Sequence, residues 1–215
     1  MIYLWRFFLG CVAACFFGLA ALFFLAPLHP GDAPVTGSAA IRSEPEGEDA
    51  TRHYLPGGTS IATPAAWHMI PADRLHQFDR FGLAARAGPG SRILLATADA
   101  ETPDQMRGVL ILMRAGQGDA DLVPRMQAYL ERIRPKLSQA TVIHDAKPTQ
   151  TANLPAASAG FRAVQEGRIG RRTVTGRLDL IQTGRIPVLA IRIASIGSRA
   201  ENQLTDVLKT LGIEH

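Results

Sequence analysis

The residues with the clearest chemical potential are arginines that gather in one C-terminal stretch. Between Phe161 and Arg199 there are eight arginines but only two acidic residues, Glu166 and Asp179, which leaves an excess of six positive charges. Guanidinium groups bind carboxylates and phosphates through paired hydrogen bonds. We therefore predict a face that recognises an anionic partner, made by Arg162, Arg168, Arg171, Arg172, Arg177 and Arg185. A solvated sheet face in an arginine-rich chain is the alternative interpretation.

Residue types that bind metals or perform catalysis form no motif. The six histidines are scattered, and His68 and His76, the closest pair, are eight residues apart without a third zinc ligand nearby. No Gly-x-Ser-x-Gly elbow occurs, and the glycine pairs at 88/90 and 116/118 lack the rest of a phosphate-binding loop. We predict no catalytic residue, no metal and no cofactor, and hence no enzyme. A site assembled from distant positions is left open.

A second candidate site lies around Trp67. Trp67 and Met69 follow Pro64-Ala65-Ala66, where the chain is expected to pass from a sheet to a helix. An aromatic ring and a methionine could line a groove for a small molecule or lipid, whereas core packing is the ordinary role of such a tryptophan. A small-molecule or lipid binding domain with a pocket near Trp67 and Met69 is therefore the alternative function.

The N-terminal segment has the length of a membrane span. Residues 7–26 form a run of twenty residues without a charge, which as a helix spans about 30 Å. Arg6 precedes the run and mainly acidic residues follow it, so the positive-inside rule places the N-terminus in the cytoplasm. We predict a single-pass protein of the inner membrane with its C-terminal domain in the periplasm or outside the cell. Nucleic acid is excluded as a partner on this ground.

Residues 1–26 are read as an uncleaved signal-anchor. The apolar run exceeds the 7 to 15 residues usual in a signal peptide, although a cleaved signal peptide is an alternative. A lipoprotein signal that ends at Cys15 is another. Cys11 and Cys15 are the two cysteines of the chain, so the remainder has no thiol for a disulfide, a nucleophile or a metal site.

The segment after the anchor has the composition of a linker. Residues 27–52 contain four prolines, several glycines and serines, an acidic cluster and few large apolar side chains. Such a sequence cannot bury enough apolar surface to fold by itself. We therefore predict a tether over residues 27–52 and a folded domain over residues 53–215.

Within that domain, short apolar runs alternate with turn residues. Strands are expected at residues 54–55 and 59–64, 81–86, 92–98 and 109–113, and a three-stranded antiparallel meander at residues 159–166, 171–182 and 186–196. Apolar residues spaced by three and four predict helices at 123–134 and 199–211, the second with Ser198 as N-cap. A nearly uninterrupted apolar strand at 109–113 must be covered on both faces, which requires a layered domain.

This order of elements resembles the PsbP-like superfamily. The resemblance is carried by Leu55-Pro56-Gly57-Gly58, Ile61, Pro64-Ala65-Ala66-Trp67, the helix around 126–133, the meander and the closing helix, and it covers roughly residues 54–213. It implies an α+β domain, an α/β/α sandwich around an antiparallel sheet, preceded here by one transmembrane helix. It also implies an accessory or binding role, as for the photosystem II extrinsic subunits of that superfamily. We thus expect a membrane-anchored, non-catalytic extracytoplasmic protein that recognises a protein or an anionic envelope component.

Overall fold

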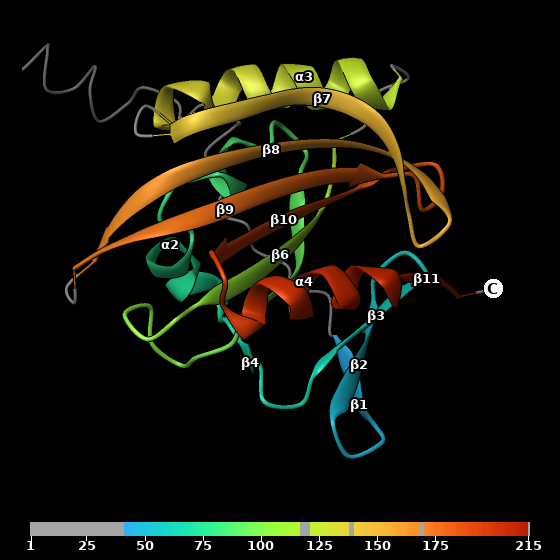
Figure 1. Ribbon diagram of the computed structural model, residues 1–215. Helices are drawn as coiled ribbons and strands as arrows, with labels where there is room; N and C mark the ends of the chain where they lie inside the picture. The colour runs from blue at the N-terminus through green and yellow to red at the C-terminus, as the bar shows by residue number, and fades with distance from the viewer. Residues whose placement is uncertain (1–40, 117–120, 138–139, 168–169, 215) are drawn as a thin grey trace, which may run out of the picture. The chain divides into compact units, whose positions relative to one another are not determined.

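The structure is a computed structural model that describes residues 41–116, 121–137, 140–167 and 170–214 (Figure 1). The predicted anchor over residues 1–26 and the tether up to residue 40 lie outside these described residues. Among the described residues, no helix combines the length and the apolar character needed to cross a bilayer.

A seven-stranded, wholly antiparallel sheet forms the centre of the domain. Its strand order is β4-β5-β6-β10-β9-β8-β7. The strands are β4 (His68–Met69), β5 (Arg92–Ala98), β6 (Gly108–Arg114), β7 (Ala140–Thr151), β8 (Leu154–Gly167), β9 (Gly170–Ile181) and β10 (Val188–Ser195). The predicted meander is confirmed, because β8, β9 and β10 are sequential antiparallel neighbours. The apolar run at 109–113 is β6, which is central and buried on both faces as expected.

Helix α3 (Leu122–Ile133) covers one face of this sheet. It contacts β7, β8 and β9, and Figure 1 shows it lying along β7. Met126, Leu130 and Ile133 are inaccessible to solvent and pack on the sheet, which confirms the predicted apolar stripe. The same layer contains α2 (Leu75–Phe78) and the 3-10 turns Ala72–Arg74, Ala84–Arg86 and Arg134–Leu137.

Helix α4 (Arg199–Lys209) covers part of the other face, together with a small second sheet. This sheet has the order β1-β2-β3-β11, with β1 (Arg42–Glu46), β2 (Ala50–Leu55), β3 (Thr59–Pro64) and β11 (Gly212–Ile213). Leu204 and Leu208 of α4 and Ile61 of β3 belong to one buried cluster with β6 and β10. The helix is anchored at its end by Thr210, whose hydroxyl accepts the Ala62 N–H at 2.9 Å.

The α+β class and the antiparallel sheet are confirmed, but the expected simple sandwich needs a correction. A second sheet stands beside α4, because β2 and β3 bury Leu55 and Ile61 against that helix. The helix itself has only 11 residues and contacts β10 and β6. A single short helix cannot cover seven strands, so the α4 face of β7, β8 and β9 is left open.

The C-terminal part of the predicted tether is also corrected. Residues 42–46 form β1, which pairs with β2 over five residue pairs from Arg42↔Tyr54 to Glu46↔Ala50. Four of the five β1 residues are exposed. The strand therefore requires backbone pairing and little apolar surface, which explains how an acidic, proline-containing sequence can form it.

The strand expected at residues 81–86 is wrong, since this segment is a turn that leads into the 3-10 helix Ala84–Arg86. Gly82 has a positive φ of 61°, which starts the turn. The buried Asp79 carboxylate then accepts the N–H groups of Leu83 at 2.9 Å and Ala84 at 2.7 Å. Desolvation raises the pKa of Asp79, while the Leu83 and Ala84 N–H groups act in the opposite sense.

Candidate functional site

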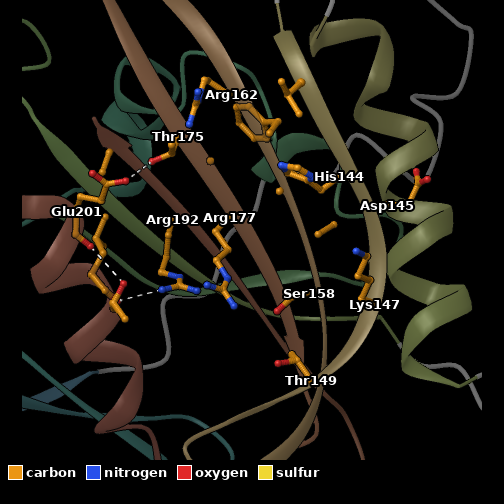
Figure 2. A pocket seen from close by; sticks show the side chains of 18 of the residues that line it. His144, Asp145, Lys147, Thr149, Ser158, Arg162, Thr175, Arg177, Arg192 and Glu201 are labelled. Carbon is orange, nitrogen blue, oxygen red and sulfur yellow. Dashed lines mark hydrogen bonds between the residues drawn. The ribbon is translucent and has the colours of Figure 1, made fainter. Parts of the chain in front are cut away.

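The open half of the large sheet forms a groove of about 800 Å³ between α4 and β7. We call it the sheet groove. Its floor is the face of β8, β9 and β10 that points away from α3, and Figure 2 shows its polar side chains. Those labelled there are His144, Asp145, Lys147, Thr149, Ser158, Arg162, Thr175, Arg177, Arg192 and Glu201, and Thr205 of α4 also lines the groove.

Strand register places the groove residues in rows that cross the sheet. In one row His144, Gly160, Arg177 and Arg192 are successive cross-strand partners. Directly opposite residues in an antiparallel pair share a face and have Cβ atoms about 4.5–5.5 Å apart. Because Gly160 has no side chain, the floor is open between His144 and Arg177.

The neighbouring rows carry the other polar groups. Lys147 pairs with Ser158, which in turn pairs with Asp179, and on the opposite side Arg162 pairs with Thr175. Rows on one face are two residues apart, or about 6.6–6.8 Å along the strand. Cationic side chains therefore recur along the groove, with Lys147 and Arg177 toward one end and Arg162 toward the other (Figure 2).

A buried ion pair lies under the groove. Asp179 is inaccessible to solvent and Arg192 is 7% exposed. Asp179 Oδ2 accepts the Arg192 Nη2 donor at 2.5 Å, and Oδ1 accepts the Ser158 hydroxyl. Arg177 Nε lies 3.6 Å from Oδ1. Two arginines directly opposite each other would repel, and Asp179 offsets this by contacting both.

Arg192 is fixed by these contacts and by its surroundings. Its Nη1 donates to the Leu204 carbonyl of α4 at 3.5 Å, whereas its Nε has no partner among the described residues. Desolvation lowers the pKa of Arg192, and the Asp179 carboxylate opposes this effect. The guanidinium remains charged at neutral pH because an arginine side chain loses its proton only far above neutral pH.

Three cations of the groove face solvent. The Arg177 side chain is 57% exposed, and Lys147 and Arg162 are also exposed. Within the described part of the chain, Lys147 and Arg162 make no side-chain hydrogen bond or ion pair. Their charges are therefore available to a ligand.

The acidic residues of the groove are already engaged. Glu201 accepts the Thr175 hydroxyl at 3.2 Å and the Gly197 N–H at 2.9 Å, close to the start of α4. Asp145 lies 3.5 Å from Arg134 of the α3 layer. The four cations Lys147, Arg162, Arg177 and Arg192 exceed the three carboxylates Asp145, Asp179 and Glu201 by one charge.

The structure brings together only part of the predicted arginine face. Arg162 and Arg177 line the groove, while Arg172 faces the other way and donates to Gln165 Oε1 at 3.1 Å and to the Met106 carbonyl. Arg185 is exposed in the β9–β10 turn and does not line the groove. Arg171 shares the strand face of Arg177 beyond the groove lining, and Arg168 lies outside the described residues.

The second candidate groove, around Trp67, needs a correction. Trp67 is 8% exposed and packs in the cluster beneath α4, where its Nε1 donates to Gln203 Oε1 at 3.4 Å. Met69 is 49% exposed on the edge strand β4. Neither residue lines the sheet groove. The tryptophan fills the core between helix and sheet in the described residues.

Sequence reasoning missed the groove residues of β7, because it missed the strand. His144, Lys147 and Thr149 come from a segment with little apolar content. Arg192 was counted among the clustered arginines but not in the predicted face, since nothing in its local sequence, Ala-Ile-Arg-Ile-Ala, indicates a buried partner. The signal that could have found it is Asp179, a carboxylate in an otherwise apolar stretch of β9.

The groove contains a serine, a histidine and an aspartate, but not in the arrangement used for acyl transfer. Ser158 donates directly to Asp179, which is already bound by Arg192. Catalysis by such residues needs the histidine between the serine and the aspartate. No hydrogen bond joins His144 to either residue in the described part of the chain. Over those same residues, no group of three potential metal ligands comes together.

Comparisons with known proteins give distant similarities only. No protein-family model matches the sequence, and no curated protein matches it. A structure from Bacteroides thetaiotaomicron VPI-5482 aligns with a TM-score of 0.45 at 18% identity, covering 76% of this chain and 48% of that one. The chain thus spans about half the length of that protein. LpqN of Mycobacterium tuberculosis, involved in cell envelope biogenesis, aligns with a TM-score of 0.41 at 15% identity over 81% of this chain and 92% of LpqN. Neither similarity assigns a family or an activity to this chain.

Proposed function

We propose that this chain is a membrane-anchored, extracytoplasmic binding protein without catalytic activity, with a PsbP-like domain that recognises an anionic envelope component or protein. The observation that carries the proposal is the sheet groove. Its exposed cations Lys147, Arg162 and Arg177 lie on an uncovered face of the central sheet, and its carboxylates are engaged by the protein itself. Complementary charge guides and orients such encounters.

The shape of the groove supports a binding role. Its volume of about 800 Å³ lies within the range of known ligand pockets, about 300–1,000 Å³. Val142, one of the few exposed large apolar side chains, gives it apolar surface beside the charges. The alternative of a small-molecule binding domain is therefore retained with the ligand in this groove and not near Trp67.

The proposed absence of catalysis rests on how the reactive groups are used. The Ser158 hydroxyl donates its hydrogen bond to Asp179, and the buried Arg192 balances the negative charge of Asp179. A nucleophilic serine needs a base that can accept its proton, and a carboxylate held by an arginine is a poor one. The polar groups of the groove floor thus serve to hold Arg192 and Arg177 in place.

The membrane setting rests on the uncharged run at residues 7–26. Fractionation of cells that express the full chain tests it. We expect the intact chain in the inner-membrane fraction, resistant to carbonate washing and released by detergent. A carbonate-soluble product that lacks the first thirty or so residues would mean cleavage and would remove the anchor from the proposal.

Site-specific photocrosslinking in membranes tests recognition through the groove. A photoreactive amino acid at Val142, 40% exposed inside the groove, should capture a partner, whereas the same probe at Ile213, 39% exposed on β11, should not capture that partner. Introducing Arg162→Glu with Arg177→Glu should abolish the Val142 product, because it reverses the charge of the floor.

The matched control is Arg185→Glu, which changes another exposed arginine, outside the groove. This variant should keep the crosslinked product at its original yield. Equal products from Val142 and Ile213, or a product that survives the double reversal, would exclude the groove as the recognition surface.

A further inference from the structure

One end of the sheet groove has the features of an oxyanion site. Lys147 is the direct partner of Ser158, Ser158 is the direct partner of Asp179, and Arg177 precedes Asp179 by two residues on β9. Lys147 and Arg177 therefore stand on opposite sides of Ser158. Figure 2 shows both at this end of the groove with Thr149, which lies two residues after Lys147 on β7.

The net charge at this end of the groove is +2. Lys147, Arg177 and Arg192 contribute three positive charges, and Asp179 removes one. The other acidic groups of the groove act elsewhere: Asp145 faces Arg134, and Glu201 is held at the other end by Thr175 and the Gly197 N–H.

The buried Arg192 has a specific part in this arrangement. It binds Asp179 at 2.5 Å and is 7% exposed, so it cannot swing out to meet a ligand. Its effect is to cancel the charge of the Asp179 carboxylate, which would otherwise repel an anion above Ser158. The two exposed cations, Lys147 and Arg177, are thus left to make the contacts.

We propose that this end of the groove binds the phosphate group of an organic phosphate monoester. This deepens the proposed function and rests on it, since it names the anionic group. A phosphate monoester carries close to two negative charges at neutral pH and has three acceptor oxygens. The Lys147 ammonium and the Arg177 guanidinium, on the two sides of Ser158, supply donors for those oxygens, and the Thr149 hydroxyl follows Lys147 along β7. A carboxylate has one charge and two coplanar oxygens, which a single arginine satisfies.

The remainder of the groove fits the rest of such a molecule. The floor at Gly160 is free of side chains, Val142 offers apolar contact, and Arg162 adds a cation at the far end. A phosphorylated small molecule or the monoester headgroup of a lipid would both present this chemistry.

Titration calorimetry on the full chain in detergent micelles tests the proposal. Inorganic phosphate and glycerol 3-phosphate are the probes, and succinate is the carboxylate control. We expect one saturable site for the phosphates, with succinate at least tenfold weaker. Lys147→Gln and Arg177→Gln should each weaken phosphate binding about ten- to a hundredfold, the usual effect of losing a hydrogen bond to a charged group.

Two further variants separate binding from folding. Thr149→Val keeps the shape and charge of the site and should weaken binding several-fold, whereas Arg185→Gln, an exposed arginine outside the groove, should leave it unchanged. Melting temperatures equal to wild type for Lys147→Gln and Arg177→Gln, both exposed residues, show that their loss of binding is local.

The source of the phosphate is distinguished with vesicles. Phosphatidylcholine vesicles with phosphatidic acid, a monoester, should bind in an Arg177-dependent way if a lipid headgroup is the ligand, while phosphatidylglycerol, a diester, should bind weakly. Binding of glycerol 3-phosphate without vesicle binding indicates a soluble ligand.

Equal affinity for succinate and phosphate, no binding of any phosphate probe, or binding unaffected by Lys147→Gln and Arg177→Gln would overturn the phosphate site. If Val142 still captures a partner in an Arg177-dependent way in that case, the proposed function stands and only the phosphate inference fails. If both experiments fail, the groove has no role in recognition.

Discussion

At the scale of single residues, the least expected feature is a fully buried carboxylate in the middle of a sheet. Asp179 is tolerated because both oxygens are occupied, Oδ2 by Arg192 and Oδ1 by Ser158. A buried ion pair often contributes little net stability, yet removing one partner leaves an uncompensated charge in a region of low dielectric. The pair therefore serves the groove more than the core, because it sets the charge of the floor.

The buried ion pair predicts that replacing one partner destabilises the protein more than replacing both. Asp179→Leu should lower the free energy of unfolding by about 3–5 kcal/mol, because Arg192 then stays buried without a counter-ion. Asp179→Leu combined with Arg192→Met should recover most of this loss. Urea unfolding of the three variants and the wild type measures both effects. A cost below about 1 kcal/mol for the single variant would show that Arg192 finds water or another partner.

At the scale of elements, the long β7–β8 hairpin builds one wall of the groove and turns in two residues. Thr151 pairs with Leu154, and the residues between them, Ala152 and Asn153, both have positive φ, 51° and 63°. This is the backbone of a type I′ turn, which suits asparagine and glycine but not alanine. The turn is therefore strained at Ala152.

The strain predicts that Ala152→Gly stabilises the protein. We expect a gain of about 0.5–1 kcal/mol, because glycine adopts a positive φ without the clash that alanine has. Ala156→Gly, on β8 with ordinary strand backbone and a buried methyl group, is the matched control and should lose about 1 kcal/mol. Chemical denaturation at one pH measures both. A loss at Ala152 as large as that at Ala156 would mean that the turn is not strained.

Another element-scale feature is the histidine that joins three strands. His53 of β2 is 4% exposed, with Nδ1 2.9 Å from the Ser43 hydroxyl of β1 and Nε2 2.9 Å from the Thr63 hydroxyl of β3. Desolvation lowers the pKa of His53 below its usual value. In the unfolded chain His53 binds a proton more readily, so acid favours unfolding.

The lowered pKa of His53 predicts how the stability of the protein depends on pH. Stability contributed by neutral His53 is present above the unfolded pKa of about 6.5 and is lost as the pH falls below it, at up to about 1.4 kcal/mol per pH unit. His53→Gln keeps hydrogen-bonding groups and should flatten this dependence between pH 7.5 and 5. The difference between variant and wild type is the measurement, because Asp79, whose raised pKa favours folding at low pH, contributes equally to both. If the free energy of unfolding of the variant and of wild type changes equally with pH, His53 gains a proton without unfolding.

The elements also show what local sequence can predict. Helices α3 and α4, the apolar strand β6 and the meander follow from periodicity, since each buries a regular apolar set. Strand β7 does not, because it is an edge strand with two register shifts and an irregular burial pattern. The predicted arginine face was only partly right, because Arg172 and Arg177 lie on opposite faces of β9. The partners Lys147 and His144 could not be predicted, because they depend on pairing with a strand that has no apolar signal.

At the scale of the whole molecule, the predicted anchor and the folded residues 41–214 define a topology that two cysteines make testable. Cys11 and Cys15, both within the predicted span, are the only thiols. A variant with Cys11→Ser and Cys15→Ser is therefore free of background labelling, and Arg185→Cys adds one exposed thiol in the β9–β10 turn, away from the groove.

A membrane-impermeant maleimide should label this variant in intact spheroplasts as completely as after lysis, because Arg6 precedes the apolar run and the segment just after it is poor in Lys and Arg, which favours export of the domain. A cytoplasmic protein with a single exposed cysteine, labelled only after lysis, is the control for membrane integrity. Labelling of the Arg185→Cys variant only after lysis would place the groove in the cytoplasm. The envelope setting would then fail, while the phosphate site, which depends on the groove residues and not on the side of the membrane, would still be open to the calorimetric test.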